Sequence, residues 1–230
     1  MSNDTEHSTV GQQGFAILPH ILSPEVANKI SNEISQLVSH RSRAGVRHAM
    51  QLEPVTRIAS CSELMALACG VLGPQAFPFR ATIFDKSPEA NWLVVWHQDT
   101  ALPLRRRLEA PGWGPWSTKE GIPYAHAPAE VLSHVLALRI HLDDSNADNG
   151  PLRVLPRTHS LGVLSDDRIH QLSEQVAAVE CIVPRGGVMA MRPLLLHASS
   201  KSRSEIPRRV LHIEYAASES IASPLELEVV

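Results

Sequence analysis

The sequence predicts a mostly β protein with flanking α-helices, arranged as a double-sheet barrel or jelly roll with supporting helices near the N-terminus. Two observations predict this class. Before Pro74 the chain contains two segments with helical spacing of apolar residues. After Pro74 it consists of short segments rich in β-branched and aromatic residues, separated by turns that contain Pro or Gly. Helices followed by a series of short strands favour two packed sheets with the helices outside.

The N-terminal helices are predicted from their ends and their periodicity. Residues 1–13 are polar and lack a hydrophobic period, so we expect them to form a flexible tail. Ser23 precedes Pro24, a typical helix start, and apolar residues then recur every three or four positions, which predicts a helix over residues 24–39 with one apolar face. A second helix is expected over residues 62–72, ended by Gly and Pro.

Short apolar or alternating runs predict the strands, and Pro and Gly mark the turns between them. The strands are expected at residues 14–19, 79–84, 93–96, 135–142, 152–155, 181–183, 188–191 and 210–215. Residues 100–129 carry most of the aromatic residues and several prolines, so we expect a long loop there. Such a loop is either a lid or substrate wall, or a structural insertion, and the sequence favours neither.

Length and composition indicate one domain. The chain has 230 residues, of which 43% are hydrophobic and 20% charged, and its mean hydropathy is -0.07. These values are typical of a soluble globular domain, which we expect to span residues 14–230. No apolar run is long enough to span a bilayer, and the first residues are polar and acidic, unlike a secretory signal. We therefore expect a cytoplasmic protein that does not contact a membrane.

Charge and cysteine content exclude other classes of partner and site. The net charge of -3 gives no basic surface for a nucleic acid backbone, so nucleic acid is not an expected partner. The three cysteines have no paired spacing, which argues against a disulfide framework or a zinc-thiolate site. The basic cluster at residues 105–107 is more typical of a solvated loop edge than of a site for an anionic substrate.

His97 and Asp99 are the first candidate metal ligands. They follow the apolar residues 92–95, and positions two apart on a strand point to the same face. An imidazole nitrogen and a carboxylate oxygen can therefore converge on one ion. By itself the pair is weak, because this spacing arises by chance and a strand end often meets solvent. The facial triad of non-haem Fe(II) oxygenases also needs a second histidine from a distant strand.

His197 is the best candidate for that histidine, because it follows the apolar residues 194–196 at an expected strand end. His212 is a rival. Beyond His197, Arg208 begins the last expected strand, where its guanidinium could hold a carboxylate through two parallel hydrogen bonds. Its neighbour Arg209 would point to the other face. Without further information, two adjacent arginines are more often a solvated basic pair.

These motifs belong to a longer ordered series. Its members are Phe84-Asp85-Lys86-Ser87-Pro88, Trp96-His97-Gln98-Asp99, Leu142-Asp143-Asp144, Asn149-Gly150-Pro151, Thr158-His159-Ser160, His197-Ala198-Ser199 and Arg208. The series resembles the phytanoyl-CoA dioxygenase family of Fe(II)/2-oxoglutarate-dependent oxygenases, over roughly residues 14–216, and the order is more specific than any single motif. The chain departs from the family in one turn, where Arg157 stands at a position usually occupied by Gly. This change should not affect the chemistry.

The resemblance implies a double-stranded β-helix of the cupin-like kind. In this fold iron would be held by His97, Asp99 and His197, and 2-oxoglutarate would chelate the metal. The residues expected to contact the cosubstrate are Arg208, Ser199, Gln98 and Lys86. A tryptophan, Trp113 or Trp116, would line the same pocket. We take Trp116 as the candidate, although the spacing does not choose between them.

The same resemblance implies a dioxygenase that uses O₂ to hydroxylate an unactivated C–H bond of a small molecule, with release of succinate and CO₂. Asp99 favours a hydroxylase over related halogenases, in which a small residue replaces the carboxylate. The same iron chemistry could instead give desaturation, epimerisation or cyclisation. A different class is a catalytically silent, cupin-like metal-binding protein. A zinc hydrolase is disfavoured, because Arg208 would then have no purpose.

The sequence does not identify the substrate or the oligomeric state. Nothing specific to CoA recognition stands out, so phytanoyl-CoA is not carried over, and the fold does not fix the substrate. Arg139 in the expected strand over residues 135–142, together with Arg105, suggests a substrate with an anionic group.

Overall fold

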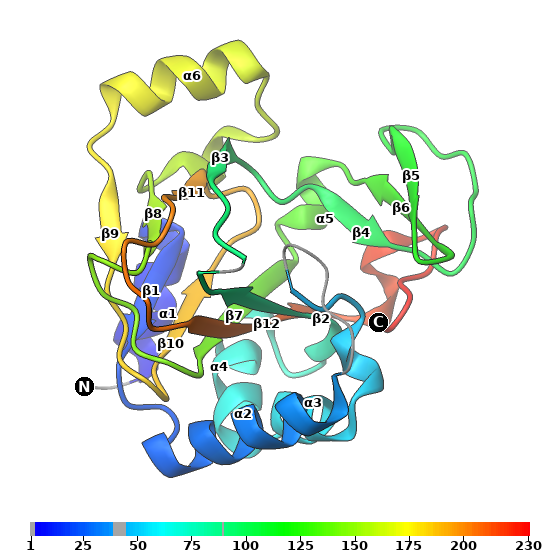
Figure 1. Ribbon diagram of the computed structural model, residues 1–230. Coiled ribbons are helices and arrows are strands. Elements are labelled where there is room, and N and C mark those ends of the chain that lie inside the picture. Colours follow the sequence, from blue (N-terminus) through cyan, green and yellow to red (C-terminus); the bar gives the residue numbers. More distant parts are fainter. Residues whose placement is uncertain (1–2, 39–44, 89) are drawn as a thin grey trace.

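The computed structural model describes residues 3–38, 45–88 and 90–230, which form three antiparallel sheets (Figure 1). The largest sheet has the strand order β1 (Phe15–Leu18), β10 (Val188–Met191), β7 (Val135–His141), β12 (Arg208–Ala216) and β2 (Phe77–Lys86). The second has the order β3 (Val94–His97), β11 (His197–Ser199), β8 (Leu152–Val154) and β9 (Val179–Cys181). The third has the order β4 (Ala101–Pro103), β6 (Ile122–His126) and β5 (Trp116–Lys119).

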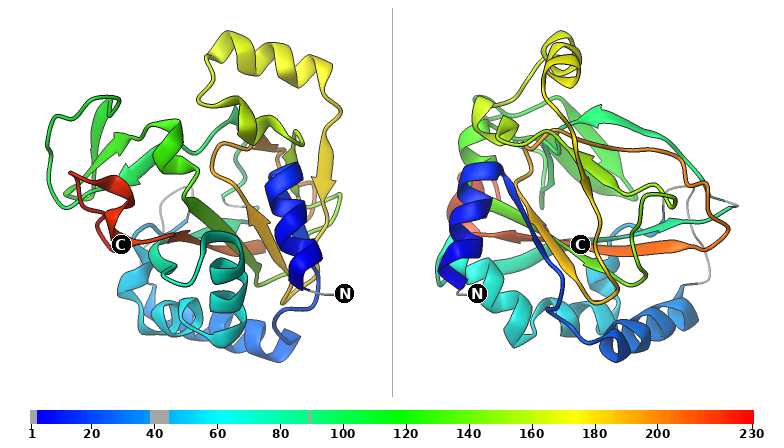
Figure 2. Two further views of the ribbon diagram at one scale, coloured as in Figure 1. Left: turned by 180° about the vertical axis from the view of Figure 1, so that it is seen from behind. Right: turned by 90° about the vertical axis from the view of Figure 1, so that its left-hand side faces the viewer.

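Helices cover one face of the five-stranded sheet (Figures 1 and 2). They are α2 (Pro24–Leu37), α3 (Glu53–Ala59) and α4 (Ser62–Leu72). The helix α1 (Asn3–Gln13) packs beside α4 and β1. The remaining short helices are η1 (Ala49–Gln51), α5 (Ala129–Leu132), η2 (Thr158–Leu161), α6 (Asp166–Gln175) and η3 (Glu219–Ala222).

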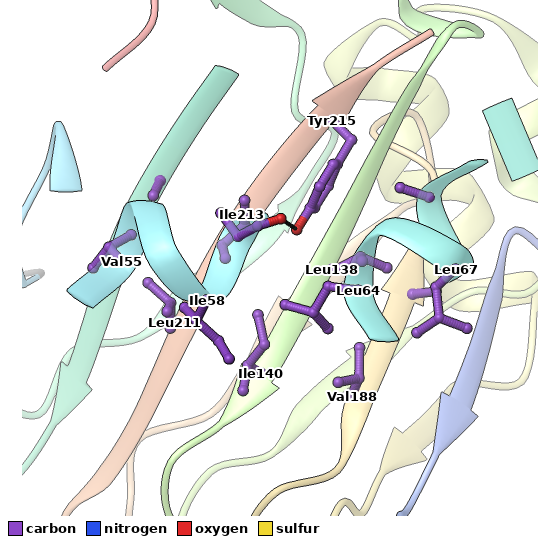
Figure 3. Packing of buried hydrophobic residues seen from close by; sticks show 14 of the residues in the cluster. Val55, Ile58, Leu64, Leu67, Leu138, Ile140, Val188, Leu211, Ile213 and Tyr215 are labelled. Atoms are coloured by element: carbon purple, nitrogen blue, oxygen red, sulfur yellow. Dashed lines mark hydrogen bonds between the residues drawn. The ribbon is translucent and has the colours of Figure 1, made fainter. Parts of the chain in front are cut away.

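The core between these helices and the sheet follows from the alternation of residues along the strands. In β7 and β12, Leu138, Ile140, Leu211, Ile213 and Tyr215 face the helices and are buried in one hydrophobic cluster (Figure 3). The helices contribute Val55, Ile58, Leu64 and Leu67 to the same cluster. The hydroxyl of Tyr215 donates a hydrogen bond to the carbonyl oxygen of Ala59 at 2.8 Å, which ties α3 to the sheet.

The opposite face of the same strands is polar, and it faces the interior of the protein. Its polar residues are Arg80, Thr82 and Lys86 on β2, Arg139 and His141 on β7, and Arg208, His212 and Glu214 on β12, and the apolar Phe84 and Val210 lie among them. At the other end of the sheet, Met189 and Met191 pack with Leu152 and Val154 of the four-stranded sheet. The two sheets therefore enclose an interior that is apolar at one end and charged at the other.

Several elements differ from the sequence prediction. The predicted flexible tail over residues 1–13 contains α1, in which Val10 is buried. Val10 is the one hydrophobic side chain in its sequence, so there is no hydrophobic period from which a helix could be predicted. The helix α3 was not predicted. Residues 100–129, predicted as a loop, contain β4, β5 and β6, which are only three to five residues long and include Pro103 and Pro123. Short strands with proline carry little of the alternation on which strand prediction depends.

No single helix among the described residues is long and apolar enough to cross a membrane. The pair α3 and α4, bent by 54° at a short break, meets the requirement only when both helices are taken together, by length and composition. Both helices contribute buried residues to the core against the five-stranded sheet.

Replacing Leu64 with Ala tests the importance of this core. Leu64 is fully buried in α4, so Leu64→Ala should lower the free energy of unfolding by about 2–5 kcal/mol in urea denaturation. Leu37 ends α2 with 54% of its surface exposed, so Leu37→Ala is the matched control and should change that energy by less than about 0.5 kcal/mol. Equal effects of the two changes would contradict the packing described.

Candidate metal centre and its two cavities

Three side chains that the sequence proposed as metal ligands meet at one point. His97 ends β3, His197 begins β11, and the two residues are direct partners in the antiparallel β3–β11 pair. Asp99 follows β3, and its backbone N–H donates to the carbonyl oxygen of Pro193 at 2.9 Å. One ligand atom from each of the three side chains lies within 4.8 Å of the others. The pairing of two distant strands thus completes the group that the His-x-Asp spacing begins.

In each histidine, the hydrogen bond made by Nδ1 fixes the direction in which Nε2 of the same ring points. The Nδ1 of His97 lies 2.9 Å from the carbonyl oxygen of Val95, and the Nδ1 of His197 lies 2.9 Å from that of Leu195. A carbonyl oxygen only accepts hydrogen bonds, so Nδ1 carries the proton in both rings and Nε2 keeps its lone pair. Both Nε2 atoms face Asp99, at 3.7 Å from His97 and 3.5 Å from His197. The rings therefore present metal-binding nitrogens toward one carboxylate.

Electrostatics favour an ionised Asp99 beside a neutral His197 ring at neutral pH. Burial lowers the pKa of His197 to about 4, so its ring is neutral. Burial alone would raise the pKa of Asp99, but the facing imidazole rings and the guanidinium of Arg80 outweigh it and hold that pKa well below its ordinary value. Two nitrogen lone pairs and a carboxylate thus face one another. A cation stabilises such a set, and two imidazoles with one carboxylate fit Fe(II) with positions left open.

Beside these ligands lies a small cavity of about 90 Å³ that is lined by buried cations. Arg139 from β7 and Arg208 from β12 line it, and Lys86 from β2 is the direct cross-strand partner of Arg208. All three side chains are buried. Within the described part of the chain, none of the three forms an ion pair with a carboxylate. The positive charge of the cavity is therefore not balanced by a carboxylate from that part of the chain.

The hydrogen bonds of these cations go to neutral groups. Lys86 donates to the hydroxyl of Ser199 at 2.9 Å, and Arg208 donates from Nε to the carbonyl oxygen of Asn149 at 3.1 Å. The Nε of Arg139 is buried without a hydrogen-bond partner. Burial of this positive charge lowers the pKa of Lys86 to about 7 and the pKa values of Arg208 and Arg139 to about 10. A bound dicarboxylate would supply the missing charge, so the cavity fits 2-oxoglutarate.

Arg208 and Arg209 are adjacent in β12 and point to opposite faces, as the sequence predicts. Arg209 donates from Nε and Nη2 to the carboxylate of Asp143, at 2.7 and 2.8 Å. This bidentate pair neutralises Arg209 on the side of the helices. Arg208 lines the cavity that also contains His97 and His197. The alternation of the strand therefore separates a structural arginine from one that is available to a ligand.

The side chain of Gln98, predicted to contact the cosubstrate, is occupied by the backbone of two loops. Its amide NH₂ donates to the carbonyl oxygens of Gly162 and Leu194, at 2.9 and 2.7 Å. Its Oε1 accepts from the backbone N–H of Leu164 at 2.8 Å. All of its strong hydrogen-bonding groups are thus used. Gln98 therefore positions the loops on either side of the metal ligands.

Trp116 and Arg105 lie away from the small cavity. Trp116, in β5, packs against the hydrophobic cluster around Leu102 and Leu104, with the guanidinium of Arg107 5.6 Å from its ring centroid. Trp113 packs against the same cluster. The guanidinium of Arg105 pairs with Glu226 at 2.7 Å, and both side chains are exposed. The fold therefore turns both tryptophans toward this cluster and Arg105 toward solvent, which the motif spacing did not indicate.

Arg139 and His212 belong to one buried network. The Nη1 of Arg139 donates to Nδ1 of His212 at 2.9 Å, and Nε2 of His212 lies 3.7 Å from Glu214. The two nitrogens of His212 are therefore engaged, and His212 is not part of the group formed by His97, Asp99 and His197. Arg139, predicted to face the substrate, lines the same cavity as Arg208.

A larger cavity of about 320 Å³ adjoins the metal-binding group at Asp99. Phe84 and Asp99 line both cavities, so Asp99 lies where the two spaces meet, while His97 and His197 line the small one. The residues that line the larger cavity are Gly45, Arg47, Arg80, Thr82, Phe84, Gln98, Asp99, Thr100, Ala101, Lys119, Tyr124 and His126. Most come from β2 and from the three-stranded sheet. The sequence analysis missed this wall, although the period of two in β2 places Arg80, Thr82 and Phe84 on one face.

Two facing sheets, a group of two histidines and one carboxylate, and a cation-lined cavity beside it define a class. They are the features of an Fe(II)/2-oxoglutarate-dependent oxygenase built on a double-stranded β-helix. Comparison with known proteins agrees. The family profile of phytanoyl-CoA dioxygenase (PhyH) matches residues 10–210, and the chain belongs to this family. The predicted family, fold class and enzyme class are thereby confirmed, as are the predicted cofactors, iron and 2-oxoglutarate.

Relatives of known activity are similar over most of their length. The chain is 25% identical to L-proline trans-4-hydroxylase of Streptomyces griseoviridis, covering 89% of this chain and 83% of that protein. It is 20% identical to the ectoine dioxygenase of Nocardia farcinica, covering 93% and 77%. The solved structure of EctD from S. alaskensis with bound Fe has a TM-score of 0.72 at 16% identity, covering 98% and 79%. Another structure of EctD contains 2-oxoglutarate and 5-hydroxyectoine.

The pKa of Lys86 predicts how cosubstrate binding depends on pH. With that pKa at about 7, Lys86 is charged below neutral pH and loses its proton above it. A dianion binds the charged form better, so 2-oxoglutarate affinity should fall as pH rises from 6.5 to 8.5, by up to about tenfold per pH unit. Anaerobic titration of the Fe(II)-loaded protein measures this. Lys86→Arg stays charged and should flatten the profile; an equally steep profile in that variant would contradict the assignment.

Proposed function

We propose that this protein hydroxylates an unactivated C–H bond of a small molecule, with His97, Asp99 and His197 as the ligands of Fe(II). The observation that carries the proposal is the position of these ligands between two cavities. The small cavity, with its uncompensated cations, would receive 2-oxoglutarate. The larger one, at Asp99, would receive the substrate. In this proposal the cosubstrate and the substrate would lie on separate sides of one metal.

Iron and 2-oxoglutarate, when bound here, would supply the oxidation. With O₂, 2-oxoglutarate is converted to succinate and CO₂, and one oxygen atom enters a C–H bond of the substrate. The protein supplies the geometry. The backbone carbonyls of Val95 and Leu195 hold the imidazole rings, so that each offers Nε2. Gln98 fixes the loops beside Asp99. The three metal-binding side chains are therefore held in place before iron or 2-oxoglutarate binds.

The cations of the small cavity orient the cosubstrate. Arg208 and the Lys86–Ser199 pair would hold the distal carboxylate, because Arg208 and Lys86 lie side by side across the β12–β2 pair. Arg139, on β7, would add positive charge for the same anion. Phe84 and Trp92 give this cavity apolar walls that limit access of water. A dianion held in a low-dielectric site is bound more strongly than at the surface.

The substrate and the outcome of the oxidation are proposed more broadly. The names of the relatives supply L-proline and ectoine as the first small molecules to test. Desaturation, epimerisation or cyclisation would use the same residues, and only the product distinguishes them. A cytoplasmic location and a single domain over residues 14–230 stay predictions from the sequence.

A comparison of the two adjacent arginines tests the cosubstrate site. The anaerobic complex of the protein with Fe(II) and 2-oxoglutarate should show a visible metal-to-ligand charge-transfer band, and Asp99→Ala should abolish it. Arg208→Ala should weaken 2-oxoglutarate binding by about 10- to 100-fold, because a charge-assisted contact is lost. Arg209→Ala, the matched control, should change it less than about threefold, since Arg209 pairs with Asp143. Equal losses in both arginine variants would contradict the proposed site.

Turnover should depend on a bound substrate. We expect succinate release to rise when the correct small molecule is added, and the product to gain the mass of one oxygen atom. Mass spectrometry of reactions with L-proline, ectoine and related compounds measures this. A product that loses two hydrogens, or keeps the mass of the substrate, would replace hydroxylation with desaturation or epimerisation. A charge-transfer band without turnover of any compound would favour the silent metal-binding alternative.

A further inference from the structure

The larger cavity has a strongly one-sided charge. Its lining contains three cationic side chains, from Arg47, Arg80 and Lys119, and one carboxylate, from Asp99. Asp99 is a member of the metal-binding group and would face the metal. The part of the cavity away from the metal therefore presents positive charge without a lining anion. An anionic substrate would be attracted by such a wall, whereas a cationic one would be repelled.

Carboxylates outside the lining neutralise only two of these three cations. Arg80 is paired with the buried Glu214 and also donates to the carbonyl oxygen of Ala101 at 2.7 Å. The guanidinium of Arg47 lies 3.8 Å from Glu120, whose side chain is 56% exposed. The guanidinium of Arg80 is therefore paired within the protein, and its charge is already balanced. Arg47 has only a weak, solvent-screened partner at the rim.

Lys119 is the cation that remains. Among the residues that the structure describes, no carboxylate lies within ion-pair distance of its ammonium. Its Nζ lies 4.4 Å from the ring centroid of Tyr124, a cation–π contact that orients the side chain along the cavity wall. The group is half-buried, so its charge is screened less than that of a surface lysine. Lys119 thus has both the exposure and the unbalanced charge that an anionic ligand requires.

The local structure fixes Lys119 at the end of a tight hairpin. Lys119 pairs with Ile122 across the β5–β6 ladder, and the two residues between them, Glu120 and Gly121, have φ angles of 51° and 85°. Positive φ at both central positions is typical of a two-residue hairpin turn. Glu120 also lies 3.4 Å from Nδ1 of His48, the residue that precedes η1. The strand pairing and the tight turn therefore fix where the backbone of Lys119 lies in the wall.

We propose that the larger cavity binds a small organic acid, with its carboxylate held by Lys119 and supported by Arg47 at the rim. This inference rests on the proposed function, since it assigns the substrate class of the same site. The body of the acid would lie against Phe84 and Tyr124, and the carbon to be oxidised would point toward Asp99. This assignment replaces the sequence-based expectation that Arg139 and Arg105 hold the anionic group. Arg139 lines the other cavity, and Arg105 is paired with Glu226.

Pairs of acids and their amides test this proposal, because the amide keeps the shape of the acid and removes its charge. The probes are pentanoate, cyclopentanecarboxylate and benzoate, each compared with its primary amide. Dissociation constants are measured by calorimetry on the anaerobic complex with Fe(II) and saturating 2-oxoglutarate. The visible band of the complex is recorded in the same samples, so that displacement of 2-oxoglutarate is detected.

The wild-type complex should bind at least one acid about tenfold more tightly than its amide. Lys119→Gln should reduce this preference to less than about threefold, whereas Lys119→Arg should keep it. Lys119→Met is a second variant that removes the charge and keeps the length of the chain. Arg105→Gln removes an exposed cation outside the cavity and should leave the preference unchanged.

The proposal is overturned if no acid is preferred over its amide, or if the preference survives in both Lys119→Gln and Lys119→Met. An intact visible band in those samples shows that such a failure concerns the substrate class alone. Absence of the band in the wild-type complex before any acid or amide is added would instead overturn the proposed iron and 2-oxoglutarate site.

Discussion

The arrangement of the site depends on one antiparallel strand pair. The pairing of β3 with β11 places His97 opposite His197, residues that are far apart in the sequence. In each strand the ring Nδ1 is bound to the carbonyl two residues earlier, so the strands fix both the position and the tautomer of the ligands. A slip of this register by one residue would turn one imidazole to the opposite face. Every other feature of the site is useful only if this register holds.

The five-stranded sheet supplies stability with one face and function with the other. On β12, Leu211, Ile213 and Tyr215 enter the core beneath the helices, while Arg208 and His212 alternate with them toward the site. Burial of unpaired cations lowers the stability of the fold by on the order of several kcal/mol per ion before a partner binds. A large apolar core on the opposite face offsets this loss, and a bound dianion would remove it. The unpaired cations are thus a local instability that the cosubstrate would relieve.

The sequence identified the candidate ligands because they stand in short motifs. His97 and Asp99 are two residues apart, His197 follows an apolar run, and Arg208 begins the last expected strand. Arg208 and Arg209 were also separated correctly by the period of two. The turn at Arg157, which departs from the resembled family, retains a left-handed backbone, with φ of 69°. This conformation favours Gly, which explains the residue usually found there.

The walls of the cavities could not be predicted in the same way. Lys119 and Arg47 come from segments with no motif, and tertiary packing alone brings them to the space beside Asp99. Trp116 shows the converse: the spacing did not choose between it and Trp113 as a residue of the cosubstrate pocket, and both pack against a hydrophobic cluster instead. Short strands that contain proline show too little alternation of polar and apolar residues for their pairing to be predicted from the sequence. Local patterns therefore identified the chemistry, while the shape of the site required the fold.

The central claim is that His97, Asp99 and His197 bind one iron between two distinct cavities. A crystal structure of the anaerobic complex with Fe(II) and 2-oxoglutarate, with iron located by anomalous scattering, tests it most directly. The account predicts iron bound by Nε2 of both histidines and by the carboxylate of Asp99, with 2-oxoglutarate extending toward Arg208 and the larger cavity open on the other side. Iron at another site, ligation through Nδ1, or 2-oxoglutarate extending toward Lys119 would contradict it.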